Sequence, residues 1–161
     1  ELSLEAFSPF GTFQNMIVPK STCLGKEPIL FFPDVLRLDL GGNAVAGIST
    51  CCVRYRKLVV DTTEFHTATG EAIIPLNADV FIHVAKPTGD AVVLWDKIRI
   101  FRVPMGTCVV LNPGVWHHAP FLIHENQFQS ASILVLLPVR TYAKDCVVVE
   151  LPRDHQTQIA F

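Results

Sequence analysis

The hydrophobic residues of this chain come in short blocks that turn-forming residues interrupt. Residues 35–40 alternate between leucine and other side chains, which is typical of a half-buried strand. Turn signals at intervals of roughly 8–12 residues are typical of a sandwich, a jelly roll or a barrel. The pattern therefore predicts an all-β fold. The further strand candidates lie at 45–55, 57–62, 71–75, 79–85, 92–103, 108–111, 117–123, 131–138 and 145–151.

The two ends of the chain depart from this strand pattern. Residues 3–10 predict a short N-terminal helix with Ser3 as its N-cap. Residues 12–18 predict a strand, and residues 19–28, with two prolines, one glycine and three charged residues, predict an exposed loop. The polar tail at 153–161 is expected to lie on the surface or to exchange onto a neighbouring subunit.

The composition favours a single domain over residues 1–161, long enough for a substantial core. Half of the residues are hydrophobic and only 17% are charged, which leaves little polar surface and favours association of subunits. The net charge of −2, without a basic run, argues against nucleic acid and anionic membranes as partners. No stretch reaches the roughly 18 uninterrupted apolar residues that a membrane span needs.

The cysteines and the first residues predict a cytoplasmic location. Five cysteines are an odd number and form no Cys-x-x-Cys pair, so we expect reduced thiols. The first residues show no positive region followed by an apolar block, so no signal peptide is expected.

A pair of histidines follows a rigid turn in the second half of the chain. Residues 108–111 predict a buried strand, and Asn112-Pro113-Gly114 then forces a turn, because proline fixes φ and glycine tolerates positive φ. His117 and His118 come directly afterwards. Imidazoles between apolar strands are costly unless they are hydrogen-bonded or bind something. A pair of hydrogen-bonded structural histidines is the alternative interpretation.

A second polar cluster lies at residues 64–71. Glu64 and His66 share a face if they lie in a strand, and a turn at Gly70 brings Glu71 back to the same side. One imidazole and two carboxylates on one face can bind a divalent ion or perform acid–base chemistry. His117 or His118 would complete the set from the other sheet, and strand alternation favours His117 as the inward residue.

These two clusters resemble the two motifs of the cupin superfamily. Gly106, the turn at 112–114 and His117 follow the order of the second motif. Glu64-x-His66 and Glu71 follow the order of the first, with glutamate in place of the first histidine. The resemblance implies a cupin-type double-stranded β-helix, a jelly-roll barrel. It also implies one divalent metal ion held by Glu64, His66, Glu71 and His117.

A narrower resemblance, to the ureidoglycolate lyase family of allantoin breakdown, covers most of the chain. It implies a homodimer that splits ureidoglycolate, a small carboxylate, into glyoxylate and urea. The chain departs from the family pattern at Thr67, where proline is usual, and at Glu71, where glutamine is usual. The matching stretches are Leu4–Phe7, Phe10-Gly11, Glu64–His66, Ile73–Leu76, Ile98–Phe101, Val115–His118 with Pro120, and Asp145-Cys146.

Cleavage of the C–N bond in such a substrate needs a base for the hydroxyl proton and an acid for the departing nitrogen. His117 or His66 is the predicted base, because imidazole changes charge near neutral pH. Glu71 is the predicted acid if burial raises its pKa. Arg99 and His118 are the candidates for binding the substrate, Arg99 through a bidentate grip on the carboxylate. Alternation also allows Arg99 simply to face solvent.

Two other functions stay open from the sequence. One is a different metal-dependent cupin enzyme, an isomerase or a dioxygenase, that uses the same four ligands. The other is a non-catalytic cupin that binds a small ligand. Among the remaining histidines, His83 is expected to be a packed or barrel-lining residue, and His124 is expected in a loop.

Overall fold

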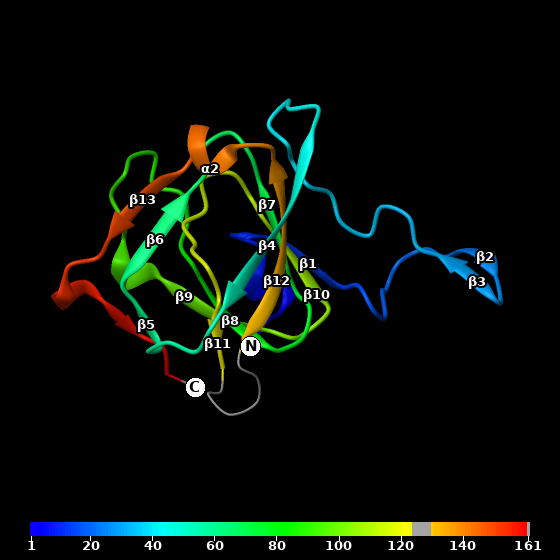
Figure 1. Cartoon of the computed structure of the whole chain (residues 1–161), viewed down its shortest axis with the longest axis horizontal. Helices are drawn as coiled ribbons and strands as arrows, with labels where there is room; N and C mark the ends of the chain where they lie inside the picture. Colours follow the sequence, from blue (N-terminus) through cyan, green and yellow to red (C-terminus); the bar gives the residue numbers. More distant parts are fainter. Residues whose placement is uncertain (124–129, 161) are drawn as a thin grey trace.

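Most strands belong to two antiparallel sheets that face each other (Figure 1). The structure is a computed structural model and describes residues 1–123 and 130–160. Paired strands are often distant in sequence, as in a jelly roll. The larger sheet has the order β1 (Gly11–Asn15), β10 (Thr107–Leu111), β7 (Glu71–Pro75), β12 (Ala131–Pro138) and β4 (Ala46–Val53). The smaller sheet has the order β11 (Phe121–Leu122), β8 (Val80–Val84) and β9 (Arg99–Val103).

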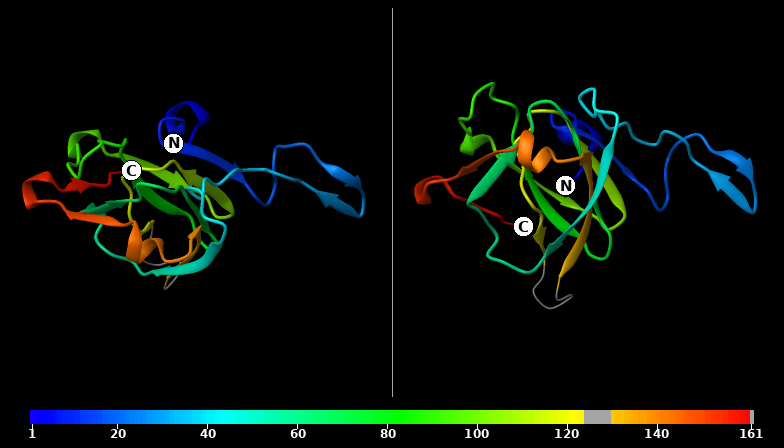
Figure 2. Two further views of the ribbon diagram at one scale, coloured as in Figure 1. Left: turned by 90° about the horizontal axis from the view of Figure 1, so that it is seen from above. Right: turned by 45° about the horizontal axis from the view of Figure 1, so that its top comes forward.

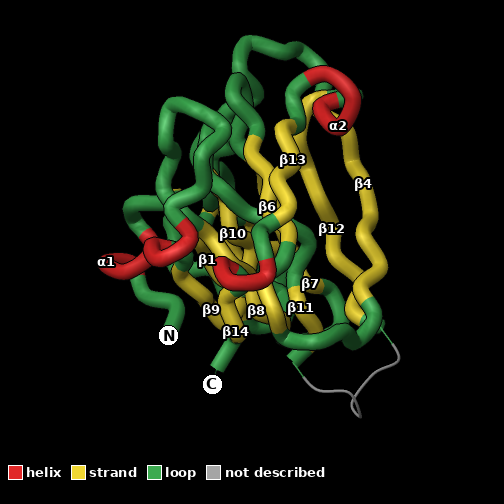
Figure 3. Tube along the Cα trace, turned by 90° about the vertical axis from the view of Figure 1, so that its left-hand side faces the viewer, coloured by secondary structure: helices red, strands yellow, loops and turns green. Residues whose placement is uncertain are grey.

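Shorter elements complete the fold (Figure 3). Three two-stranded ladders join β13 (Val147–Glu150) to β6 (Thr62–Phe65), β14 (Thr157–Gln158) to β5 (Val59–Val60), and β2 (Leu24–Lys26) to β3 (Ile29–Phe31). The helices are α1 (Leu4–Phe7), α2 (Thr141–Lys144) and the 3₁₀ turns η1 (Trp95–Lys97) and η2 (Arg153–His155). None of the helices in the described ranges has the length and apolar character to cross a membrane.

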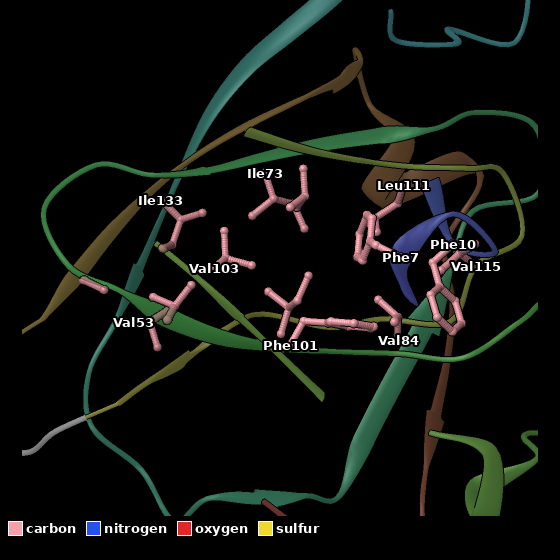
Figure 4. Close-up of a cluster of buried hydrophobic side chains, with 14 of the residues drawn as sticks. Phe7, Phe10, Val53, Ile73, Val84, Phe101, Val103, Leu111, Val115 and Ile133 are labelled. Atoms are coloured by element: carbon pink, nitrogen blue, oxygen red, sulfur yellow. The ribbon is translucent and has the colours of Figure 1, made fainter. Parts of the chain in front are cut away.

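The core lies between the two sheets, where alternate residues of each strand point inward. Figure 4 shows Ile73, Leu111 and Ile133 of the larger sheet opposite Val84 and Phe101 of the smaller one; all five are buried. Burying one such side chain contributes about 1.5–3 kcal/mol. The core therefore fixes the strands whose ends carry the polar clusters.

Helix α1 closes one end of this core. Ser3 accepts a hydrogen bond from the backbone of Ala6 and is the N-cap, as predicted. The fully buried Phe7 packs edge-on against Phe101, with ring centroids 5.2 Å apart. The all-β, cupin-type fold with a short N-terminal helix is thus confirmed, although the ladders among the described residues do not close into a continuous barrel.

The structure corrects several predicted strands. Residues 35–40 form no strand; they cross the outer face of the larger sheet, where Leu36 and Leu38 pack against a small cluster around Val110. The alternating leucines of this segment are partly buried against the sheet, but the backbone does not pair with a neighbouring strand in the described ranges. Only the second half of 92–103 is a strand, because η1 occupies 95–97, and in 117–123 only β11 is extended. The predicted loop at 19–28 carries β2 and leads into β3.

The described part of the tail packs on its own chain. β14 pairs with β5, with Thr157 opposite Val60 and Gln158 opposite Val59, and Ile159 is buried. Exchange of this segment onto a neighbouring subunit, one of the two predicted alternatives, is therefore not what the structure contains.

Candidate active site

A cavity of about 510 Å³ opens between the larger sheet and the chain segments that cross its upper end. Strands β4, β7 and β12 form its apolar wall, with Ile73, Val135 and Leu137 among the lining residues. The polar wall comes from three separate parts of the chain. Its ionisable side chains include Glu64, His66, Glu71, His118, Arg140, Tyr142 and Cys146.

One carboxylate oxygen joins two buried imidazoles beside this cavity. Oε2 of Glu71 lies 2.9 Å from Nε2 of His66 and 3.2 Å from Nε2 of His117. All three side chains are buried. The turn at Gly70 brings Glu71, the first residue of β7, back to His66, which follows β6 directly. The predicted clustering of His66, Glu71 and His117 is thus present in the structure.

Backbone carbonyls fix the hydrogen on the other nitrogen of each ring. Nδ1 of His66 lies 2.6 Å from the carbonyl of Asp145, and Nδ1 of His117 lies 2.8 Å from the carbonyl of Val115. A carbonyl only accepts, so both Nδ1 atoms must donate. Both Nε2 atoms then face one oxygen of Glu71. Both contacts are hydrogen bonds only if two protons are shared among Oε2 of Glu71 and the two Nε2 atoms. The two imidazoles and the carboxylate then carry a net positive charge.

The electrostatics of Glu71 differ from the sequence-based prediction. Burial raises the pKa of this carboxyl, but the charge of His117 and the hydrogen bonds from His117 and His66 outweigh it and lower the pKa to about 2. Burial lowers the pKa of His117, but Glu71 outweighs it and raises the pKa above its usual value. The prediction that burial makes Glu71 an acid is wrong, because the carboxylate is ionised between two donors.

Glu64 adds a second carboxylate next to the imidazoles. Its backbone pairs with His117 through two hydrogen bonds of 2.6 and 2.8 Å, and its side chain accepts one from the thiol of Cys146 at 3.2 Å. Burial and the nearby Glu64 raise the pKa of Cys146 to about 12, so this thiol stays protonated. Glu64 therefore offers an oxygen on the side of His66 and His117.

The donor set fits a divalent metal ion. Ligand atoms of Glu64, His66 and His117 all lie within 4.8 Å of one another. Both imidazoles present Nε2 while Nδ1 is held by a carbonyl, which is how metal-binding histidines are usually oriented. A cation would also replace the positive charge that two shared protons supply around Glu71. Two imidazoles with carboxylates suit transition metals such as Zn²⁺, Fe²⁺ or Mn²⁺.

The loop that carries His66 is held from both sides. The carboxylate of Asp145 accepts hydrogen bonds from the backbone of Thr67 at 2.8 Å and of Ala68 at 2.9 Å, and one from the Thr67 hydroxyl. On the other side, the carbonyl of Asp39 accepts from the backbone of Gly70 at 2.8 Å. The loop between β6 and β7 is thereby fixed without regular secondary structure of its own.

A close approach of two backbones reinforces this loop. Gly41 has a φ of +59°, and a Cβ there would lie 1.9 Å from the carbonyl oxygen of Ala68. Only glycine allows both the positive φ and the contact. Residues 39–41 and the loop therefore form one packed unit.

A family model described as ureidoglycolate lyase matches residues 1–158. The chain belongs to this family. A ureidoglycolate lyase of Rhodobacter capsulatus is 29% identical over 118 residues, which cover 72% of this chain and 72% of that protein. A ureidoglycolate lyase of Pseudomonas entomophila is 28% identical over 127 residues, which cover 77% of this chain and 75% of that protein.

Solved structures resemble this ureidoglycolate lyase family member more distantly. A mutant of the 3,4-ketoisomerase QdtA from Thermoanaerobacterium thermosaccharolyticum has a TM-score of 0.46 and 12% identity, covering 84% of this chain and 85% of that one. Oxalate decarboxylase from Bacillus subtilis has a TM-score of 0.42 and 15% identity, covering 65% of this chain and 24% of that one. The family assignment rests on the family model.

The structure brings His117 to Glu64, His66 and Glu71, where the prediction put it, but it also turns His118 toward the cavity, which strand alternation did not predict. His118 lines the cavity, whereas His117 lies against Glu71 and is not among the lining residues. The chain bends after Gly114 and makes only isolated bridges, so strict strand alternation does not apply. Burial, together with the charges of Arg56 and His117, lowers the pKa of His118. Its Nδ1 is buried without a hydrogen-bond partner among the described residues.

The predicted arginine is not at the site. Arg99 is exposed on β9 and lines a separate surface groove with Lys97, as the solvent-facing alternative required. The arginine among the lining residues of the cavity is Arg140, just before α2. Arg140 has a φ of 65°, which is uncommon for a residue other than glycine. Its position after β12 gave no sequence signal.

The remaining histidines lie away from the cavity or outside the described residues. His83 is fully buried and contacts the hydroxyl of Thr63 at 3.1 Å through Nε2. Thr63 in turn donates to the carbonyl of His117 at 3.1 Å, so His83 supports the chain behind the site. His155 stacks on Trp95, with ring centroids 4.7 Å apart. His124 lies outside the described residues.

Proposed function

We propose that this protein cleaves ureidoglycolate into glyoxylate and urea. The observation that carries the proposal is a cavity of this family member that combines a guanidinium, an accessible imidazole and a charged imidazole–carboxylate group. These groups are Arg140, His118, and His66 with Glu71. Each matches one requirement of the reaction: holding a carboxylate, accepting a proton, and donating a proton.

Arg140 is the proposed anchor for the substrate carboxylate. A guanidinium forms paired, charge-assisted hydrogen bonds with a carboxylate. Glu64 lines the same cavity, and its carboxylate repels that of the substrate and directs it toward Arg140. The substrate's hydroxyl and carbinolamide carbon would then lie toward His66 and His118.

The two cavity histidines divide the proton transfers. His118 takes the hydroxyl proton, because its lowered pKa keeps the imidazole neutral near pH 7. The oxygen electrons form the new C=O bond, and the C–N bond breaks with its electron pair on the urea nitrogen. His66, hydrogen-bonded to the ionised Glu71, delivers the proton to that nitrogen. Proton exchange with solvent between His118 and His66 restores the starting state.

A divalent metal ion would be held by Glu64, His66 and His117. When bound, it would displace the Nε2 protons of His66 and His117, so it would supply Lewis acidity in place of the proton that His66 delivers in the metal-free protein. Elemental analysis tests this part separately from turnover. Near-stoichiometric metal in the purified protein, lost in a His117→Ala variant, is the expected result. Metal retained in that variant would refute this ligand set.

The assay for the reaction is release of glyoxylate from ureidoglycolate, with and without added divalent metals. His118→Gln should lower kcat by roughly 10²–10⁴-fold, the usual contribution of a general base. No glyoxylate under either condition would refute the proposed reaction. Stabilisation of the fold by ureidoglycolate without turnover would instead indicate the non-catalytic ligand-binding alternative.

Arg140→Ala should raise KM by roughly 10–100-fold, because one charged hydrogen-bonded contact contributes about 1.5–3 kcal/mol. The effect on kcat should be small, and Arg140→Lys should recover part of the loss. Arg99→Ala is the matched control and should leave KM unchanged, since Arg99 lies in another groove. Equal KM values for the Arg140→Ala variant and the original protein would exclude Arg140 as the anchor.

We further propose that the protein works in allantoin breakdown in the cytoplasm as a homodimer. All five cysteines are free thiols, in keeping with a reducing compartment. The low share of charged residues favours burial of surface between subunits.

A further inference from the structure

The β2–β3 hairpin projects from the body of the molecule with apolar side chains exposed. Figure 1 shows it on the side of the larger sheet, away from β6 and β13, and both views of Figure 2 show it extended rather than folded back. Leu24, Ile29 and Phe31 are all exposed, Ile29 by 74%. A two-stranded hairpin of this length is marginally stable alone in water, so this arm requires a partner surface.

An uncharged sheet surface lies on the same side of the molecule. β4 is the edge strand of the larger sheet, and its eight residues pair with β12 along one side only among the described strands. Neither strand contains a charged residue. On the outer face, Ile48 is 76% exposed, Cys52 is exposed and Leu134 is half-buried.

A free edge of this kind is normally protected by lysine, proline or a bulge. β4 has no lysine and no proline, and its register with β12 runs without a bulge from Ala46 to Val53. An exposed, uncharged edge strand is a surface for association. We therefore expect the outer face of β4 and β12, here called the β4–β12 face, to be covered in solution.

We propose that the β2–β3 hairpin of one copy packs on the β4–β12 face of a second copy, and that the exchange is reciprocal. The two surfaces lie on one side of each molecule, so a twofold axis lets each arm reach the partner's sheet. Apolar side chains of the hairpin meet a face without charges, and the charged residues of the hairpin, Lys26 and Glu27, lie at its turn, where they remain at the rim of the contact. This inference builds on the proposed homodimer and identifies its contact surfaces.

The size of the two surfaces agrees with a stable dimer. Residues 16–31, together with alternate residues of the eight-residue strands β4 and β12, amount to about two dozen residues. A standard interface uses roughly 20–30 residues a side. Continuity also favours this arrangement, because residues 32–44 run from the hairpin across the outer face of the same sheet to β4.

The test uses a charge swap. Ile29→Lys in the hairpin and Ile48→Glu on the β4–β12 face should each convert the protein from twice 17.8 kDa to 17.8 kDa in sedimentation equilibrium at micromolar concentration. Mixing the two variants should restore the dimer, since one arm–face contact is native and the other pairs lysine with glutamate. Val148→Lys, an exposed apolar position on β13, is the matched control and should remain a dimer.

Three results would overturn the proposal. The unaltered protein could sediment as a monomer, either variant could remain dimeric, or the mixture could stay monomeric. The last result would indicate contacts of like with like, such as β4 against β4. Far-UV circular dichroism of each variant verifies folding. Sedimentation is independent of turnover, so a failed lyase assay with an intact dimer refutes only the proposed function.

Discussion

Replacing Glu71 by glutamine tests the charge balance at the site. Glutamine keeps the shape and one acceptor but removes the negative charge between His66 and His117. The fall in the pKa of Glu71 from 4.5 to about 2 corresponds to about 3 kcal/mol of stability, at roughly 1.4 kcal/mol per pKa unit. Glu71 is only 9% exposed, so solvent screening reduces this little. The amide recovers one hydrogen bond and costs less to bury, which leaves an expected loss of about 2 kcal/mol.

The loss should depend on pH in a defined direction. The pKa of Glu71 is lowered, so its contribution is present above pH 4.5 and is lost as pH falls toward about 2. The pKa of His117 is raised, so its contribution is present below pH 6.5 and is lost as pH rises through the raised value. The difference between the original protein and the Glu71→Gln variant should therefore be largest between pH 4.5 and 6.5.

Thermal unfolding followed by circular dichroism, in buffer with a chelator, measures this difference. For a chain of this length, 2 kcal/mol corresponds to a Tm lower by roughly 4–8 °C. Glu150→Gln, an exposed carboxylate on β13, is the control and should change Tm little at any pH. A Tm difference of the same size at acidic and alkaline pH would refute the reasoning, because removal of a charge-dependent interaction cannot have a constant effect.

Three further predictions concern the surroundings of the site. Asp145→Ala removes the carboxylate that holds the loop and should lower kcat/KM by more than about tenfold. Asp145→Asn keeps one acceptor oxygen and should retain part of the activity. Cys146 should react slowly with a thiol reagent at neutral pH, because its pKa is about 12; fast modification would contradict the hydrogen bond from its thiol to Glu64. Gly41→Ala should lower Tm more than Gly42→Ala, since both have positive φ but only the first meets Ala68.

The residues that the sequence predicted correctly lie at the ends of strands with clear patterns. Glu64 and His66 follow the face of β6, and Glu71 opens β7 after a glycine turn, so local geometry brings them together. His117 was predicted from its place in the second cupin motif, after the turn at 112–114. The charge state of Glu71 could not be predicted, because it depends on two hydrogen bonds whose distances the sequence does not contain.

Residues that act through distant contacts escaped the sequence-based prediction. Arg140 reaches the cavity because a left-handed backbone and α2 turn the chain at the end of β12. Arg99 was preferred because it lies in a strand with a clear pattern, yet that pattern does not tell which face meets the cavity. Likewise, the alternation at 35–40 predicted burial correctly, but hydrogen-bond pairing needs a neighbouring strand, which this segment lacks among the described residues.

The bond between Asp145 and the loop after β6 has a consequence for biosynthesis. His66 receives its orienting carbonyl from a residue 79 positions later in the chain, and the same residue fixes Thr67 and Ala68. The paired strands that enclose the core are complete by Pro138. During translation the sheets can thus pack before the segment that orients His66 has left the ribosome. A free chain that ends at Lys144 should therefore be protease-resistant yet inactive, so completion of the sheets and onset of catalysis are separate events.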